Sequence, residues 1–364
     1  MLPRNAGSVF LALMLGAAPA WGAESEPARS HVTFTAPQLE KLRQVLQADA
    51  GAATAFDPVK NLADKSLGET PNPIRRIVSE GRLHTDPEKK KSLAARRDLF
   101  KIEALGLAYA LLGKMSYGKK ARDYVLAWAR AYEPDGNPIN ETEFPRLMKA
   151  YDLTRALFSA SDRSQVEPWF LRMAERQRAG IKPSSTTSKN NHHSHRLKII
   201  GHVAFLLPDS TLIGWVVDDA KRHLEVNLNP DGSTFDFQQR DALHYHVYDL
   251  LPLVELATAA DKNKIDLYGY TTRQQATLEK SIAFLIPYVT GEKEHREFVR
   301  STVKFDAERS GSEDPSIRVG ETWDPRKAKP LFDVAGYFTP AFHQVKFPDG
   351  DGRPSFDRFI ATHR

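Results

Sequence analysis

Apolar residues recur three and four positions apart along most of this chain, and this spacing predicts amphipathic α-helices rather than strands. After Pro37, for example, Leu39, Leu42, Val45 and Leu46 share one helical face. The same pattern predicts further helices in several regions. These are 105–112 (ending at Gly113), 119–132, 143–158, a helix capped by Ser161 or Asp162, 196–207, 211–228, 246–260 and 271–290.

Turn sequences separate the predicted helices at 134–138 and 229–232, where Pro, Asp, Asn and Gly cluster. Helices of similar length that alternate with turns predict an all-α fold, an (α/α) toroid or barrel of antiparallel helix pairs. The Pro-, Asp- and Arg-rich residues 295–364 predict a short irregular or β-containing C-terminal extension, with strands at 297–306 and 334–347. Because no Ser/Pro-rich linker interrupts the chain, we expect a single domain over 24–364.

The first 23 residues have the features of a signal peptide. Arg4 precedes an apolar run from Ser8 to Ala18, and Ala20 and Ala23 are candidate cleavage positions. This run is too short to span a membrane. We therefore expect a periplasmic or secreted protein whose mature form has no membrane segment.

Composition narrows the candidate chemistry. The chain has no cysteine, which excludes a disulfide framework, a thiolate zinc site and a thiol nucleophile. Its net charge of +5 favours an anionic partner. Since we expect export, an acidic polysaccharide is the favoured partner and nucleic acid is not expected.

Two polar clusters about fifty residues apart carry the candidate chemistry, 190–195 with the sequence NNHHSH and 240–248 with the sequence RDALHYHVY. Together they supply amides, imidazoles, a guanidinium and phenols. These groups can bind a carboxylate, remove the proton on the adjacent carbon and protonate a leaving oxygen. Asn191 and His192 are predicted at a helix start, which favours anions. Arg240, His244 and Tyr248 are spaced to share a helical face.

Other interpretations of the same residues stay open. Asn190 or Asn191 could be a helix cap beside surface histidines, and Tyr245 and Tyr248 could be core aromatics. Five histidines could hold a metal, although the chain lacks a His-Glu-x-x-His motif. A nucleophile elbow is absent from the sequence, and the acidic residues that a glycosidase would need do not stand out. Those acidic candidates are Glu141, Asp236 and Asp241.

Several segments between residues 70 and 310 resemble the alginate lyase superfamily of bacterial polyuronate lyases. The specific ones are Asn190-Asn191-His192 and the 242–248 block ALHYHVY. Suggestive ones are Gly81-Arg82-Leu83, Asp86-Pro87, 124–128, 136–141, Tyr151-Asp152-Leu153, Asp231-Gly232 and Gln239-Arg240. The C-terminal segments 297–299 and 304–306 look closer to polysaccharide lyase family thirty-eight, whose members act on glucuronan or alginate.

The resemblance implies an (α/α) toroid and cleavage of a polyuronate by β-elimination, leaving 4,5-unsaturated uronate ends. It implies that Asn191 and Arg240 neutralise the substrate carboxylate and that His192 and Tyr248 are the base and acid. The chain departs from the family pattern because Asp241 stands where the arginine is expected, and Arg240 is one position earlier.

We thus predict a polysaccharide lyase acting on glucuronan or alginate, without cofactor or metal. Further candidates for substrate binding are Arg82, His84, Arg146, His193, His244, Tyr245 and Arg300. Two alternatives remain, a non-catalytic periplasmic protein that binds acidic glycans and a metal-dependent glycan hydrolase. The sequence leaves open which uronate is preferred, whether cleavage is endo or exo, and the oligomeric state.

Overall fold

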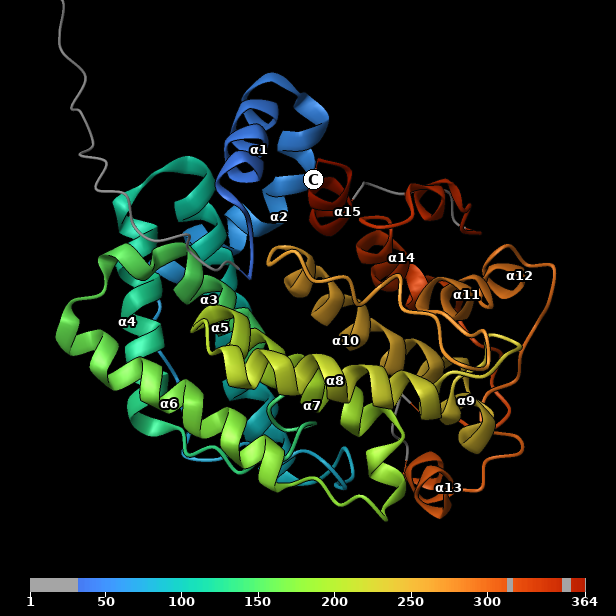
Figure 1. Cartoon of the computed structure of the whole chain (residues 1–364). Helices are drawn as coiled ribbons and strands as arrows, with labels where there is room; N and C mark the ends of the chain where they lie inside the picture. Colours follow the sequence, from blue (N-terminus) through green and yellow to red (C-terminus); the bar gives the residue numbers. More distant parts are fainter. Residues whose placement is uncertain (1–31, 313–316, 349–354, 364) are drawn as a thin grey trace, which may run out of the picture.

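The computed structural model describes residues 32–312, 317–348 and 355–363, and it is built mainly of helices, as the periodicity of the sequence predicts (Figure 1). The predicted signal peptide lies outside the described residues. Within the described residues strand pairing is limited to two isolated bridges, Leu228 with Thr234 and Arg296 with Thr322. None of the helices described is long and apolar enough to cross a membrane.

Local capping chemistry explains where the first helices begin and end. The N-cap side chains of Thr35, Asp49, Asp86 and Ser159 each accept a backbone N–H, and α3 ends at Gly113 with φ of 72°. The helices are α1 Ala36–Ala48, α2 Ala50–Leu67, α3 Pro87–Leu112, α4 Met115–Ala131, α5 Phe144–Thr154, α6 Ala160–Ala179 and α7 Asn191–Leu206. The predicted cap of α6 was misplaced, because Ser159 is the cap and Asp162 completes its capping box. The predicted helices do not include α2.

The second half of the chain contains two long helices and several short ones. They are α8 Ser210–Asn227, α9 Phe235–Arg240, α10 Leu243–Asp261, α11 Leu278–Ala283, α12 Ile286–Val289, α13 Lys304–Gly311, α14 Lys329–Ala335 and α15 Phe356–Thr362. Short 3₁₀ segments are η1 Arg155–Leu157, η2 Thr186–Ser188, η3 Pro325–Ala328 and η4 Pro340–Gln344.

Two sequence predictions for this half are wrong. The helix predicted over 271–290 is two short helices, and Pro287, which lacks an N–H, falls in the first turn of α12. The strands predicted over 297–306 and 334–347 do not form among the described residues. Those segments contain the start of α13, the end of α14 and η4, and the only β-type pairing nearby is the bridge at Arg296.

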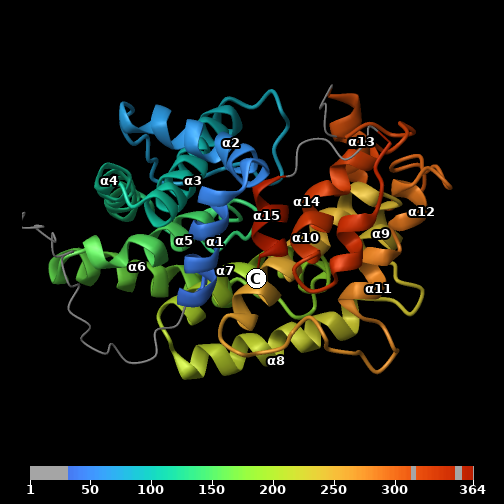
Figure 2. The same ribbon diagram turned by 90° about the horizontal axis from the view of Figure 1, so that it is seen from above.

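Burial separates an inner from an outer layer of helices. In α7 every residue except His192 is buried, whereas α8 buries one stripe, at Leu212, Val216, Ala220, His223, Leu224 and Asn227. α3, α5, α7, α10 and α14 pack successively against one another, and α4, α6 and α8 cover them from outside. Figure 2 shows the inner helices across the middle of the molecule.

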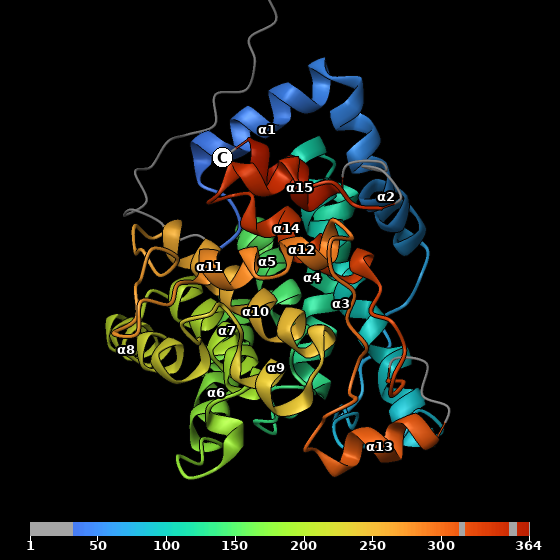
Figure 3. The same cartoon turned by 90° about the vertical axis from the view of Figure 1, so that its right-hand side faces the viewer.

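The ring of helices closes through the C-terminal segment. α15 packs against both α14 and α2, and α2 packs against α3, so the inner layer returns to its start. This arrangement confirms the predicted (α/α) toroid with a short C-terminal extension. Figure 3 shows α13 at the opposite end of the molecule from α1 and α15, and these two ends contain different pockets.

Candidate active site

A pocket of about 200 Å³ lies at the end of the toroid that carries α13. It is formed by the 79–82 loop, the N-terminal half of α3, the starts of α7 and α10, the end of α9 and α13. The residues that line it are Ser79, Glu80, Gly81, Arg82, Lys89, Leu93, Arg96, Ile139, Asn191, His192, Arg240, His244, Tyr245, Tyr248, Phe305 and Arg309. The structure therefore brings the two polar clusters of the sequence together.

The start of α7 holds Asn191 in a defined orientation. Asn190 is the N-cap, and its Oδ1 accepts the His192 N–H at 3.1 Å. The backbone N–H of Asn191 donates to Asp236 at 2.6 Å, and its Nδ2 donates to the same carboxylate at 2.7 Å. The anion at this helix start is therefore the carboxylate of Asp236, and the backbone N–H groups of Asn191 and His192 are already bonded within the protein. The Asn191 amide carries a second hydrogen that a ligand carboxylate can accept.

His192 is the one residue of α7 that is not buried, and its imidazole lines the pocket. Its Nε2 lies 4.0 Å from Glu80. The side chain of His192 is still partly buried, and this desolvation lowers its pKa to about 4, with help from the positive charges of Arg196 and Arg240. The imidazole is therefore neutral at pH 7 and can accept a proton.

Tyr248 lies one turn beyond His244 on α10, and both side chains line the pocket. Its ring centroid is 4.3 Å from that of His195, whose Nδ1 is 2.6 Å from the Thr142 hydroxyl. Burial raises the pKa of Tyr248, while the charge of Arg96 acts in the opposite direction. The phenol is therefore protonated at pH 7 and can serve as a proton donor.

The first turn of α10 is capped from a distant part of the chain. Its N-cap residue, Ala242, has no side-chain acceptor. Glu297 replaces it, because its carboxylate accepts the N–H of Leu243 at 2.7 Å and that of His244 at 3.1 Å. This contact fixes the turn that carries the pocket residues of α10. Burial raises the pKa of Glu297 to about 7.

Arg240 lines the pocket but its charge is already compensated. Its guanidinium pairs with the buried Asp306, and its Nε lies 3.8 Å from Asp236. The guanidinium carbon also lies 3.8 Å from the ring centroid of Tyr245. Arg240 therefore joins α9, α13 and α10, and it is a weaker candidate for carboxylate binding than the sequence suggested.

Asp241, which stands where the resemblance implies an arginine, has a structural role. It ends α9 with φ of 47°, in the left-handed region. Its carbonyl accepts the N–H of Phe298 at 2.8 Å, and its carboxylate accepts two hydrogen bonds from Arg300 at 3.0 Å. Asp241 thus holds the 297–300 segment, including Glu297, against the start of α10.

Sequence reasoning missed Arg96, which enters the pocket from α3. Among the described residues no partner accepts its Nε–H, and its nearest carboxylate, Glu143, is 3.6 Å from Nη2. Its charge is therefore less compensated than that of Arg240. The available signal was the spacing of Lys89, Leu93 and Arg96, which places them on one helical face. Arg309 was also missed, and its Nη1 donates to the Tyr245 hydroxyl at 3.1 Å.

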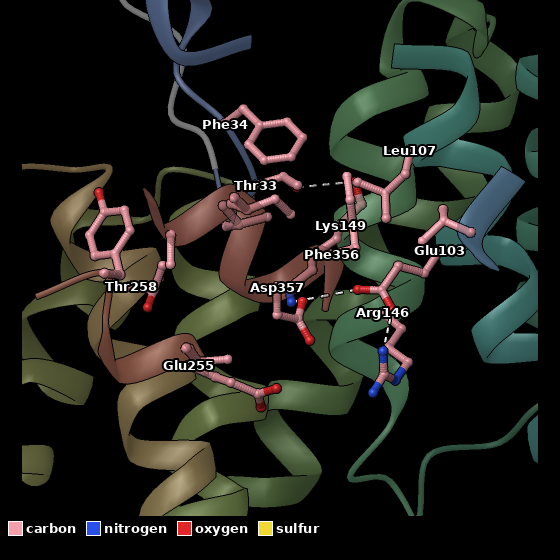
Figure 4. A pocket seen from close by; sticks show the side chains of 16 residues that line it. Thr33, Phe34, Glu103, Leu107, Arg146, Lys149, Glu255, Thr258, Phe356 and Asp357 are labelled. Carbon is pink, nitrogen blue, oxygen red and sulfur yellow. Dashed lines mark hydrogen bonds and ion pairs between the residues drawn. The ribbon is translucent and has the colours of Figure 1, made fainter. Parts of the chain in front are cut away.

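Four predicted binding residues do not line this pocket. Arg146 lies in a second pocket, of about 230 Å³, beside α15, where Glu103, Lys149, Glu255 and Asp357 surround it (Figure 4). The other three are placed elsewhere: His193 is buried and pairs with Asp219 at 3.0 Å, Arg300 is exposed and pairs with Asp241, and His84 is exposed. Arg82, His244 and Tyr245 do line the pocket.

Charge makes the pocket suitable for an anion. Its lining contains five basic side chains, Arg82, Lys89, Arg96, Arg240 and Arg309, and one carboxylate, that of Glu80.

The histidine side chains of the two clusters point in different directions. His193 faces α8, and the His246 ring lies between Thr234 and the carbonyl of Ser281. In the described part of the chain, no group of three or more His, Asp or Glu side chains is arranged to hold a metal ion.

Comparisons with known proteins agree with this fold. The family model described as alginate lyase matches residues 36–295. An alginate lyase from Bacteroides ovatus is similar in structure, with a TM-score of 0.70, 17% identity, and coverage of 92% of this chain and 99% of that one. Alginate lyase A1-III from Sphingomonas species A1 has a TM-score of 0.60 and 21% identity, covering 72% of this chain and 79% of that one. At these identities the structural likeness supports the fold. No curated protein sequence matches the chain.

Proposed function

The chain belongs to the alginate lyase family, and from that premise we propose that it cleaves a polyuronate by β-elimination in the pocket described above. One observation supports this most. Asn191, His192, Arg240 and Tyr248, which come from three helices, line a single basic pocket. An alginate lyase of similar fold has been crystallised with a tetrasaccharide (TM-score 0.58, 21% identity, 74% of this chain and 80% of that chain), which fits an oligosaccharide ligand here.

The first step of the proposed reaction is to bind and neutralise the uronate carboxylate. A proton next to an ionised carboxylate is hard to remove unless donors stabilise the charge that develops there. We assign this role to the guanidinium of Arg96 and to the second amide hydrogen of Asn191. Asp236 orients Asn191, and Arg240 supports the site through its contacts with Asp306 and Tyr245.

Proton transfer follows from the protonation states at neutral pH. Neutral His192 takes the C5 proton, the released electron pair forms the C4–C5 double bond, and the C4–O4 bond breaks. Tyr248 gives its phenolic proton to O4, so one proton is taken and one is returned. The alternative, in which Tyr248 is both base and acid, requires a phenolate. Burial works against a phenolate by raising the pKa of Tyr248.

Glucuronan and alginate are the proposed substrates. Both present a carboxylate on each sugar, and the five basic side chains of the pocket are suited to such a polymer. Arg309, on α13, can contact the carboxylate of a neighbouring sugar. Arg82, on the 79–82 loop, pairs with Asp86 at 2.7 Å and can do so only by exchanging that partner.

The test is an ultraviolet assay for the unsaturated uronate product on glucuronan, polymannuronate and polyguluronate, with and without chelator. We expect product from at least one polymer in both conditions. Tyr248→Phe is expected to remove at least about 99% of the rate, since general acid catalysis contributes roughly 10²-fold or more. Tyr270→Phe, which changes a tyrosine bonded to Glu225 away from the pocket, is the matched control.

The other outcomes identify the alternatives. Full activity in Tyr248→Phe would remove Tyr248 from the mechanism. A metal-dependent hydrolase would be indicated by two results together. Chelator would abolish cleavage, and the cleaved chains would have new reducing ends without the ultraviolet absorption of an unsaturated uronate. Salt-sensitive polymer binding without any cleavage would indicate a glycan-binding protein.

A further inference from the structure

A second basic pocket, of about 510 Å³, lies outside the inner ring between α4 and α6. We propose that it binds a distal, carboxylate-bearing segment of the same polysaccharide chain that occupies the active site. The inference rests on the proposed function for the identity of the polymer. The pocket is lined by Arg76, Ala129, Arg130, Tyr132, Glu133, Pro134, Asp135, Trp169, Arg172 and Arg176. We call it the outer arginine pocket.

Three of its arginines have no compensating partner. In the described part of the protein, no ion pair or side-chain hydrogen bond involves the guanidinium groups of Arg130, Arg172 or Arg176. Arg172 and Arg176 lie four residues apart on α6, a spacing at which like charges destabilise a helix. The positions of Arg130 and Arg176 in last turns suit the helix dipole, but Arg172 lies earlier in α6. All three side chains are exposed, so their charges are solvated in the free protein and accessible to an anionic ligand.

The two carboxylates of the outer arginine pocket are already occupied. Glu133 pairs with Arg75 at 2.9 Å and lies 3.6 Å from Arg76. Asp135 accepts the backbone N–H of Asn137 at 2.8 Å. The lining residues carry four positive and two negative charges, a net charge of +2. The pocket therefore favours an anion with more than one carboxylate.

The pocket is held in a fixed shape by the loop that forms one of its walls. At Gly136, whose φ is 79°, an added Cβ would lie 2.4 Å from the carbonyl oxygen of Arg176. Only glycine permits this approach of the loop to the C-terminal turn of α6. Trp169 donates its Nε1–H to the carbonyl of Tyr132 at 3.0 Å and links α6 to the end of α4.

Two loops connect the outer arginine pocket to the active site. Arg76 lines the outer arginine pocket and Glu80 lines the active site. Because these residues are four positions apart in the sequence, their Cα atoms lie at most about 15 Å apart. Likewise Asp135 lines the outer pocket and Ile139 the active site. A polymer that leaves the active site across these loops reaches the arginines. Guanidinium groups bind carboxylates in a bidentate way, which suits successive uronates.

The experiment compares two triple variants of equal charge. Arg130→Gln/Arg172→Gln/Arg176→Gln removes the unpaired arginines. Lys119→Gln/Lys182→Gln/Lys293→Gln removes three exposed lysines elsewhere. Each is also made with Tyr248→Phe, so that binding of long-chain polymannuronate and glucuronan can be measured without turnover. We expect the arginine variant to weaken polymer binding about tenfold at low salt, and the lysine variant to weaken it less than about twofold.

Substrates of different length distinguish the contribution of the outer arginine pocket from that of the active site. Turnover of a tetrasaccharide should be the same in both triple variants and the parent, whereas KM for the long polymer should rise only in the arginine variant. Equal loss in both variants, or equal loss on tetrasaccharide and polymer, would overturn the inference. Absence of lyase product from every protein would overturn the proposed function alone, because the binding comparison needs no product.

Discussion

At the scale of single residues, the arginines of the active site differ in whether their charge is already paired with a carboxylate of the protein. The guanidinium of Arg240 is paired with Asp306 and packed on Tyr245, whereas the carboxylate nearest to Arg96, that of Glu143, is 3.6 Å away. A guanidinium that is already paired gains less from a new carboxylate than one that is not. The proposal therefore assigns carboxylate binding to Arg96 and support of the site to Arg240.

Replacement of Arg96 tests that assignment. We expect Arg96→Gln to lower kcat/KM about tenfold to 100-fold, because a hydrogen bond to a charged group contributes roughly 1.5–3 kcal/mol. Its neighbour Arg97 is exposed, and Arg97→Gln is the matched control. Steady-state kinetics on the preferred polymer measure both. Equal kcat/KM in the two variants would exclude Arg96 from carboxylate binding.

Asp236 is expected to set a pH limit. Burial raises its pKa to about 6, so the carboxyl takes up a proton as the pH falls through that value. Protonation removes an acceptor from Asn191 and weakens the attraction to Arg240. We expect kcat/KM to fall on the acid side near pH 6, and Asp236→Asn to be slower but to lack this limb. A limb that persists unchanged in Asp236→Asn would belong to another group.

The sequence predicted part of this site. Asn191, His192, Arg240 and Tyr248 were identified from two short motifs, and they line one pocket. His193 was misplaced because neighbouring residues of a helix point about 100° apart, and it faces Asp219 on α8. Arg96 was missed because the spacing of Lys89, Leu93 and Arg96 shows only that they share a helical face, and only the fold brings that face to the pocket at the starts of α7 and α10.

At the scale of elements, α10 shows how a helix start can depend on a distant residue. Ala242 provides no cap, so Glu297 holds the first turn, and Asp241 in turn holds the 297–300 segment. The sequence predicted this helix three residues late, since the capping residue lies 54 positions away. By contrast, Gly113 and the 229–232 turn were predicted from local chemistry alone.

Removal of the Glu297 carboxylate should affect both stability and activity. We expect Glu297→Ala to lower the free energy of unfolding by about 1–2 kcal/mol, the usual cost of a lost cap. It should also reduce kcat, because the turn before Tyr248 loses its acceptor. Glu294→Ala, at an exposed position nearby, is the control in urea unfolding and kinetics. Unchanged stability in Glu297→Ala would show that the first turn does not need this cap.

At the scale of the whole molecule, the ring is closed by its last helix. Phe356 of α15 lies 5.2 Å from Phe56 of α2 and 5.8 Å from Phe359, measured between ring centroids. The toroid as a class follows from the repeated helix pairs, which the periodicity of the sequence reveals. Its closure does not, because α15 has only seven residues and packs against α2, which lies some 300 positions earlier in the sequence.

Phe356→Ala tests the closure. We expect it to lower the free energy of unfolding by about 3 kcal/mol, because a buried ring is replaced by a cavity. KM should remain unchanged, since the active site lies at the other end of the toroid. Urea unfolding and polymer kinetics measure the two effects, with Val319→Ala at an exposed site as control. A large rise in KM would show that the packing of α15 against α2 affects the geometry of the active site.

The contacts that complete the active site also determine at which stage of synthesis and folding the site can form. The pairing of Arg240 with Asp306 spans 66 residues, and the cap of α10 spans 54. Closing such loops costs entropy and slows folding. During synthesis α3 to α10 can pair as they emerge, whereas α13, which begins at Lys304, is made only after all of them. A nascent chain therefore carries helices before it carries a working pocket, and on refolding, activity should return after the helical signal.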